Sequence, residues 1–318
     1  DDAAGDDDSA GEAQDEFVRF AVITDAHLKP DETHTNNLVM AQTIEILNAM
    51  DPPIELVLLT GDLLDELPSD DPAYYEDNGG TALDQIEALL AGLEIPWLAV
   101  LGNHDYYQSG GGLLNDLTDD LPAREALLVD RLGLPGLWYR HDHRGIAFYG
   151  LNTMQPHPDA GWIPESVGSF GPDQVAWLQQ QLSDGAPAVL FFHHPLALDN
   201  AVEAGFSAGM AFEVPRAEGD YDKYSGTEFE DWTDPIYAVL EQHAAQILAI
   251  FVGHGHWFVR DELDGVPVMM TDSTGNSPLQ TSTGEGDDEQ PMRYQVGEVN
   301  LTDGELTILN EDLFTYNL

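Results

Sequence analysis

The chain has 318 residues, of which 59 are acidic and 10 are basic, so its formal net charge is −49. The absence of cysteine excludes disulfides, zinc–thiolate sites and thiol nucleophiles, and no apolar run approaches the roughly 18 residues that a membrane-spanning helix needs. Ten cations are also too few to assemble a basic patch, which argues against binding of nucleic acid or an anionic membrane through such a patch.

The first 16 residues contain no large apolar side chain, and we expect a disordered acidic leader over 1–16. From residue 17 onwards, apolar runs alternate with helical spacings, which predicts a single domain over 17–318. The predicted strands cover 17–23, 56–59, 97–101, 137–140, 146–149, 188–192 and 247–252, and the predicted helices cover 35–50, 81–93, 172–182 and 234–243. Short alternating strands follow as far as 309, and insertion loops are expected near 67–80, 106–120 and 199–233. This order of elements indicates two packed sheets flanked by helices.

Five of the predicted strands run directly into short polar motifs. In open α/β sheets, ligands bind at the carboxyl ends of the strands, so these motifs are candidates for one shared site. Any one of them alone is more often a turn or a capped strand, but five in succession favour a common function. The motifs are Asp25-Ala-His27, Gly61-Asp62 with Asp65, Gly102-Asn103-His104-Asp105, His193-His194-Pro195 and Gly253-His254-Gly-His256.

The side chains in these motifs are oxygen and imidazole donors without sulfur. Such donors suit divalent zinc, manganese, iron, cobalt or nickel. They are too many for one ion and about the right number for two.

In this order, the five motifs resemble those of the calcineurin-like metallophosphoesterase superfamily. The resemblance spans residues 25–256 and implies a four-layer α/β/β/α sandwich of two mixed sheets flanked by helices. It also implies two divalent or trivalent metal ions, one held by Asp25, His27 and His256 and the other by Asn103, His193 and His254, with Asp62 bridging both. By the same resemblance, His104 is the catalytic histidine, Asp65 is the carboxylate that orients it, and His194 supports the site or the fold.

Two positions depart from better-known branches of the superfamily. Asp65 stands where purple acid phosphatases place a tyrosine, so their tyrosine-to-iron charge transfer is not expected. Phosphoprotein phosphatases have a phosphate-binding arginine at the position of Glu66. The absence of that arginine argues against activity on phosphoproteins. The sequence leaves phosphatase and phosphodiesterase activity both open.

We therefore predict a hydrolase of small phosphate esters, with a nucleotide as one candidate substrate. A hydroxide shared by the two ions would attack phosphorus, and His104 would stabilise the transition state or protonate the leaving oxygen. The alternative for His104 is a supporting role in which it only orients Asn103. Because the substrate is an anion, local cations should draw it in, namely the metals with Arg140, Arg144 or Arg216. The alternative is a non-catalytic metal-binding or interaction scaffold with the same fold.

The charge of −49 also bears on the protein's surroundings. Such a surface repels itself, and salt with a Debye length of about 3 Å at 1 M relieves that repulsion. We expect adaptation to concentrated salt; an acidic exported protein from a mesophile is the alternative. The acidic leader and the missing initiator methionine favour export, and the cytoplasm of a salt-accumulating halophile is the other candidate compartment.

Overall fold

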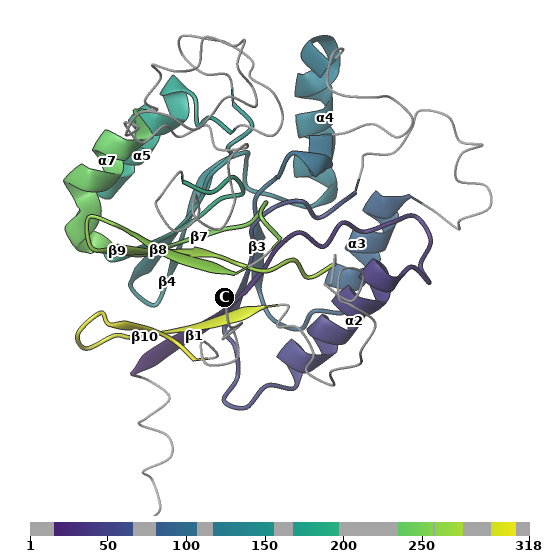
Figure 1. Cartoon of the computed structure of the whole chain (residues 1–318), viewed down its shortest axis with the longest axis horizontal. Coiled ribbons are helices and arrows are strands. Elements are labelled where there is room, and N and C mark those ends of the chain that lie inside the picture. The colour runs from purple at the N-terminus through teal and green to yellow at the C-terminus, as the bar shows by residue number, and fades with distance from the viewer. Residues whose placement is uncertain are drawn as a thin grey trace, which may run out of the picture.

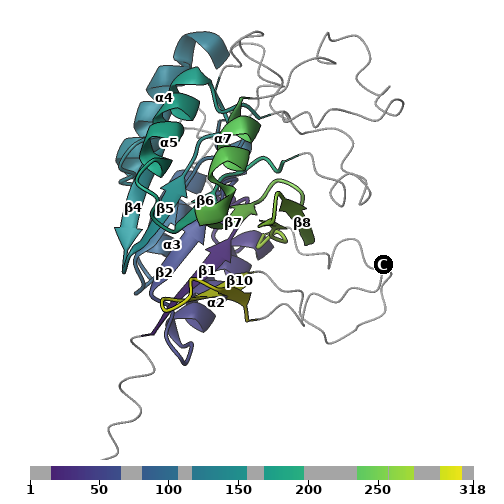
Figure 2. The ribbon, with the colours of Figure 1, turned by 90° about the vertical axis from the view of Figure 1, so that its left-hand side faces the viewer.

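The computed structural model of the chain describes residues 16–65, 81–106, 117–155, 168–196, 235–256, 258–275 and 294–309. Over these residues, two β-sheets pack against each other and helices cover their outer faces (Figures 1 and 2). This arrangement confirms the predicted α/β/β/α sandwich of two mixed sheets. Residues 1–15 of the predicted leader, the loops at 67–80 and 199–233 and most of the loop at 106–120 lie outside the described residues.

The first sheet has five strands in the order β11-β10-β1-β2-β3. Strands β1, β2 and β3 run parallel, whereas β10 pairs antiparallel with β1 and β11 pairs antiparallel with β10. The three parallel strands therefore end at the same edge of the sheet. Their bounds are Phe17–Ile23 for β1, Leu56–Leu59 for β2, Trp97–Ala99 for β3, Gln295–Asn300 for β10 and Leu306–Ile308 for β11.

The second sheet has six strands in the order β4-β5-β6-β7-β9-β8. Strands β5, β6, β7 and β9 run parallel, and the antiparallel strands β4 and β8 form its two edges. The bounds are Tyr139–His143 for β4, Ile146–Gly150 for β5, Ala188–Phe191 for β6, Ile247–Val252 for β7, Val259–Leu263 for β8 and Val266–Met270 for β9.

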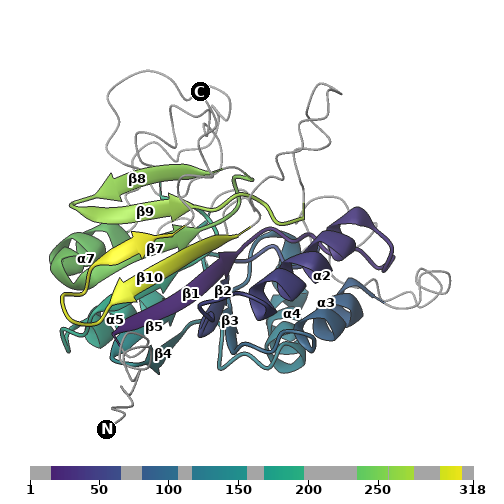
Figure 3. The same cartoon turned by 90° about the horizontal axis from the view of Figure 1, so that it is seen from below.

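Helices cover the two outer faces. Figure 3 shows α2, α3 and α4 beside the first sheet and α5 and α7 beside the second. Two short 3-10 turns complete the described elements, η3 at His104–Tyr106 and η6 at Ala244–Gln246. The helices are α2 (Thr35–Asn48), α3 (Ala82–Leu90), α4 (Leu117–Arg131), α5 (Pro172–Leu182) and α7 (Ile236–His243). No helix in this described part of the chain is both long and apolar enough to cross a bilayer.

Helix α4 is the element that the sequence analysis missed, because it begins at Leu117, inside the loop predicted at 106–120. Pro122 lies within it and interrupts the helical pattern. Tertiary contacts stabilise the helix: Leu128 is buried in the core beneath the first sheet. The Arg131 guanidinium donates to Glu87 and to Asp84 of α3.

The space between the sheets is filled by aromatic and aliphatic side chains. The Phe20 ring packs edge-to-face against Phe148 and Phe251, with ring centroids 5.6 and 5.5 Å apart. Such pairs add about 0.5–1.5 kcal/mol to the free energy of area burial. Gly297 makes room for them, because a Cβ there would lie 2.5 Å from Phe20 Cζ. This packing holds the two sheets, and the strand ends that carry the polar motifs, in one rigid arrangement.

Candidate metal centre

The polar motifs meet where the strands of the two sheets end. Asp25 N donates to Gly61 O at 3.0 Å, which joins the segments after β1 and β2, and Gly253 N donates to His193 O at 2.9 Å, which joins those after β7 and β6. The two sheets are linked in turn, because Gly275 N, beyond β9, donates to Asp25 O at 3.1 Å. The predicted metal ligands therefore come from five segments that share a hydrogen-bonded framework.

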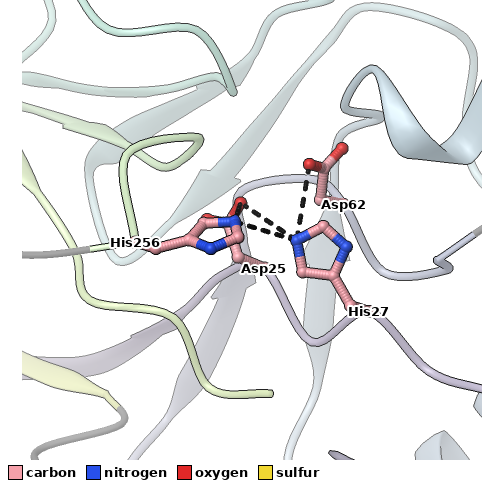
Figure 4. Close-up of side chains that lie close together, drawn as sticks. All are labelled: Asp25, His27, Asp62 and His256. Carbon is pink, nitrogen blue, oxygen red and sulfur yellow. Dashed lines mark hydrogen bonds and ion pairs between the residues drawn. The ribbon is translucent and has the colours of Figure 1, made fainter. Parts of the chain in front are cut away.

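Asp25, His27, Asp62 and His256 form the first cluster, and their candidate ligand atoms all lie within 4.8 Å of one another (Figure 4). The Nε2 atoms of His27 and His256 are 2.9 Å apart. His256 Nε2 is 3.2 Å from Asp25 Oδ1, and His27 Nε2 is 3.7 Å from Asp62 Oδ2. Two imidazole nitrogens and two carboxylate oxygens thus point at one small region, as a cation would require.

Asp62, His193 and His254 form the second cluster, again within 4.8 Å. Asp62 Oδ2 is 3.2 Å from His193 Nε2. The side-chain oxygen of Asn103 lies 3.0 Å from His193 Nε2 and 3.0 Å from His254 Nδ1, so it belongs to the same group. Asp62 is common to both clusters, and all seven predicted ligands are brought together.

Hydrogen bonds from backbone and side-chain groups orient two of the candidate ligands, His193 and Asp25, towards the clusters. The Nδ1–H of His193 donates to Thr60 O at 2.9 Å, which leaves Nε2 for a ligand. Asp25 Oδ2 accepts from the Thr24 hydroxyl at 2.6 Å and from His254 N at 2.9 Å, whereas Oδ1 faces His256. His193 and Asp25 are therefore oriented by the protein itself, and the donor set of the two clusters fits two divalent ions.

Five of the seven candidate ligands adopt a left-handed backbone conformation, which residues other than glycine rarely adopt. Their positive φ angles are 50° at Asp25, 45° at His27, 48° at Asp62, 69° at His254 and 59° at His256. Such conformations cost of order 1–3 kcal/mol each, and they gather at functional sites because the surrounding structure holds them there. The sequence analysis did not predict this feature, since the sign of φ is set by long-range bonds such as His27 N to Asp62 O at 3.0 Å.

The electrostatics suit cation binding. Burial alone would raise the pKa of Asp62, but the facing His193 and His27 rings outweigh it and hold that pKa well below its usual range. Burial, helped by the neighbouring His193, lowers the pKa of His254 to about 4. At neutral pH the site therefore offers an ionised Asp62 and a neutral His254, which are the forms that bind metals. Burial would lower the pKa of His193, but the facing Asp62 and Asp25 carboxylates outweigh it and raise that pKa to about 9, so His193 gives up a proton when a metal binds.

His104 lies beside the clusters, but its expected partner is engaged differently. His104 Nδ1 donates to the backbone carbonyl of Asp65 at 2.9 Å, where the resemblance implied the carboxylate. That carboxylate forms an ion pair with Lys29 and lies 3.8 Å from His27 Nδ1. The His104 ring is nevertheless fixed, edge-on to His27 with the centroids 4.5 Å apart.

Two further residues of the motifs, His194 and Asp105, contact the segments that carry the candidate ligands. The buried His194 ring lies 4.5 Å from the His254 ring, and its Nδ1 is 2.7 Å from the Thr153 hydroxyl. The Asp105 carboxylate accepts from Leu64 N and Gly102 N at 2.9 and 2.8 Å. Burial, with a contribution from Asp62, raises the pKa of Asp105 to about 7.

Two of the three arginines expected to attract substrate, Arg140 and Arg144, are engaged elsewhere. Arg140 forms ion pairs with Asp142 and Asp184. Arg144 pairs with Glu55 and donates to Phe17 O. Phe17 begins β1, so this contact lies at the opposite end of the strand from Asp25. Arg216 lies outside the described residues.

Among the described residues, a cation that the sequence analysis did not single out, Lys29, pairs with Asp65 beside the site. The signal was present, since Lys29 is one of two lysines in the chain and follows His27 by two residues.

Comparisons with known proteins agree with this geometry. The family model described as calcineurin-like phosphoesterase matches residues 18–258. A protein of Fibrobacter succinogenes described as a "Probable cyclic nucleotide phosphodiesterase" is 23% identical over 270 residues, which cover 81% of this chain and 80% of that protein.

Solved structures share the fold at lower identity. A dimetal phosphatase from Danio rerio superposes with a TM-score of 0.54 at 14% identity, covering 88% of this chain and 92% of that one. The structure of PhoD gives a TM-score of 0.51 at 12% identity, covering 92% and 68%. With the family model matching most of its length, the chain belongs to the calcineurin-like phosphoesterase family.

Proposed function

We propose that this protein hydrolyses small phosphate esters with two metal ions held at the ends of its parallel strands. Asp25, His27 and His256 would hold the first ion, Asn103, His193 and His254 the second, and Asp62 would bridge both. The observation that carries the proposal is the shared position of Asp62, whose Oδ2 lies 3.7 Å from His27 Nε2 in one cluster and 3.2 Å from His193 Nε2 in the other.

When bound, a pair of divalent ions supplies an activated water and neutralises the charge on the phosphoryl oxygens. The chain's own residues set the conditions for that chemistry. Asp62 Oδ1 accepts from His104 N at 2.8 Å, which ties the bridging carboxylate to the catalytic histidine. Asn103 contributes a neutral oxygen. The two clusters together therefore contain only the Asp25 and Asp62 carboxylates, and the bound metals keep more positive charge than they would with a third carboxylate.

His104 is proposed to give a proton to the leaving oxygen. Because its Nδ1–H donates to Asp65 O, proton exchange with substrate takes place at Nε2. Acid assistance of this kind contributes typically ~10²–10⁴-fold. The Asp65 residue acts in this proposal through its carbonyl, which holds the ring in place.

The substrate class is a small phosphate ester, and a cyclic nucleotide is a candidate because the Fibrobacter relative is described as a phosphodiesterase for such substrates. A panel of p-nitrophenyl phosphate, bis(p-nitrophenyl) phosphate and cyclic nucleotides would separate monoesterase from diesterase activity. It should be run at high salt on chain loaded with manganese, zinc, cobalt or nickel.

The decisive test compares Asp62→Asn with Asp130→Asn, an isosteric change at an exposed site on α4. We expect Asp62→Asn to lose bound metal and hydrolysis together, while Asp130→Asn keeps both. A wild-type chain that binds no divalent ion and hydrolyses no ester on the panel would overturn the proposal and favour the non-catalytic scaffold.

We also propose that the protein works best in concentrated salt, which the charge of −49 supports. Two described arginines join different elements by ion pairs: Arg19 of β1 pairs with Glu298 of β10, and Arg131 of α4 pairs with Asp84 and Glu87 of α3. These few pairs offset little of the total charge, so screening by salt should stabilise the fold and ease the approach of an anionic substrate.

A further inference from the structure

Lys29 lies on a segment that the surrounding structure holds firmly. Its backbone N–H donates to the side-chain oxygen of Asn37 at 2.9 Å, and the Asn37 amide donates back to Lys29 O at 2.9 Å. The neighbouring Asn36 amide donates to His27 O at 2.9 Å. Two buried asparagines of α2 therefore place Lys29 at a fixed position relative to the metal ligand His27.

The side chain of Lys29 reaches Asp65, the residue whose carbonyl holds His104. Its ammonium pairs with Asp65 Oδ2. Asp65 in turn touches both rings: its carbonyl accepts from His104 Nδ1 at 2.9 Å and its Oδ1 lies 3.8 Å from His27 Nδ1, so Asp65 links the ammonium to the proposed proton donor. The side chain is 33% exposed, so it is reachable from solvent.

The ion pair with Asp65 does not use up the ammonium. A lysine has three N–H donors, and the bond to one carboxylate oxygen leaves two. A pair in which both side chains are about a third exposed also contributes only about 0.2–1 kcal/mol to stability. Shifting or sharing that bond when an anion arrives is therefore inexpensive.

We infer that Lys29 is an anion-binding residue that contacts a phosphate oxygen of the substrate on the His104 side of the metal pair. The inference rests on the proposed function and adds the residue that recognises the phosphoryl group in place of the arginine missing at Glu66. In a chain of charge −49, one fixed ammonium beside the site supplies the local attraction that Arg140 and Arg144 are placed too far away or too firmly paired to give.

The test measures binding of inorganic phosphate to the manganese-loaded full chain by titration calorimetry at high salt. Lys29→Met is expected to weaken phosphate binding roughly tenfold to hundredfold, as for loss of a charge-assisted hydrogen bond, and Lys29→Arg should restore most of it. The manganese content should not change. Arg144→Gln is the matched control, because it removes one positive charge at the far end of β1 and should leave phosphate affinity as in the wild type.

Removing both charges separates this inference from a structural role for the ion pair. If Lys29 only neutralises Asp65, the double variant Lys29→Met with Asp65→Asn should bind phosphate as the wild type does. If Lys29 binds phosphate, the double variant should lose affinity as Lys29→Met does, whereas Asp65→Asn alone keeps or strengthens it. Equal phosphate affinity in Lys29→Met and wild type would overturn the inference, whereas a wild-type chain without esterase activity would overturn the proposed function instead.

Discussion

Substitution of Gly102 by alanine should disturb the candidate metal centre directly. A Cβ at this position would lie 2.3 Å from Asp62 Oδ1, 2.5 Å from Asp62 N and 2.8 Å from His193 Cδ2. Two of these atoms belong to the side chains of proposed ligands, and the third is the backbone nitrogen of Asp62. Gly102→Ala must therefore displace either the bridging carboxylate or the segment that carries Asn103.

The size of the effect follows from these contacts. An ordinary contact needs a separation of more than 3 Å, so Asp62 Oδ1 must move by about 1 Å, a displacement that can cost a site about 10²-fold in rate. Overpacking of this kind also destabilises a fold by about 1–3 kcal/mol. In domains of about 150–250 residues each kcal/mol lowers the unfolding temperature by roughly 2–4 °C, and a longer chain such as this one shifts by less.

The assay compares metal content, esterase rate and thermal unfolding of Gly102→Ala with those of Gly136→Ala. Gly136 is the matched control, because the nearest atom to its added Cβ is Trp138 O at 3.5 Å, an ordinary contact. We expect the first variant to lose metal affinity and about two orders of magnitude in kcat, and the second to stay close to wild type. If Gly102→Ala retained wild-type metal affinity and turnover, the assignment of Asp62 as the shared ligand would be wrong.

Three other predictions test separate parts of the proposal. His104→Ala should slow hydrolysis of alkyl esters by ~10²–10⁴-fold and of p-nitrophenyl esters much less, because a good leaving group needs no proton; equal losses would refute the acid role. Removal of metal by a chelator should lower the unfolding temperature, and manganese at 100 times its Kd should return about 2.7 kcal/mol of stability; an unfolding temperature that ignores manganese would contradict the site. The esterase rate should rise with salt from dilute buffer as self-repulsion is screened, and a steady fall from low salt upwards would count against salt adaptation.

The sequence by itself determined the architecture and the place of the site. Apolar runs and helical spacings predicted β1, β2, α5 and β7 closely. Strands such as β2 and β7 are buried on both faces and read as continuous apolar runs, whereas a helix buried on one face leaves a helical period. The motifs followed parallel strands, and parallel strands end at one edge, so the meeting of Asp25 with Asp62 could be anticipated. Helix α4 could not, because contacts with the core and with α3 stabilise it where Pro122 obscures its pattern.

Only the tertiary structure decided how the site residues are held. The left-handed backbone at Asp25, His27 and Asp62 depends on hydrogen bonds between segments far apart in the chain. The contact of His104 with the carbonyl of Asp65, and the pairing of Lys29 with its carboxylate, depend on which way a short loop turns. A motif records which chemical groups are present, whereas the direction in which each group points is fixed by neighbours that the local sequence does not contain.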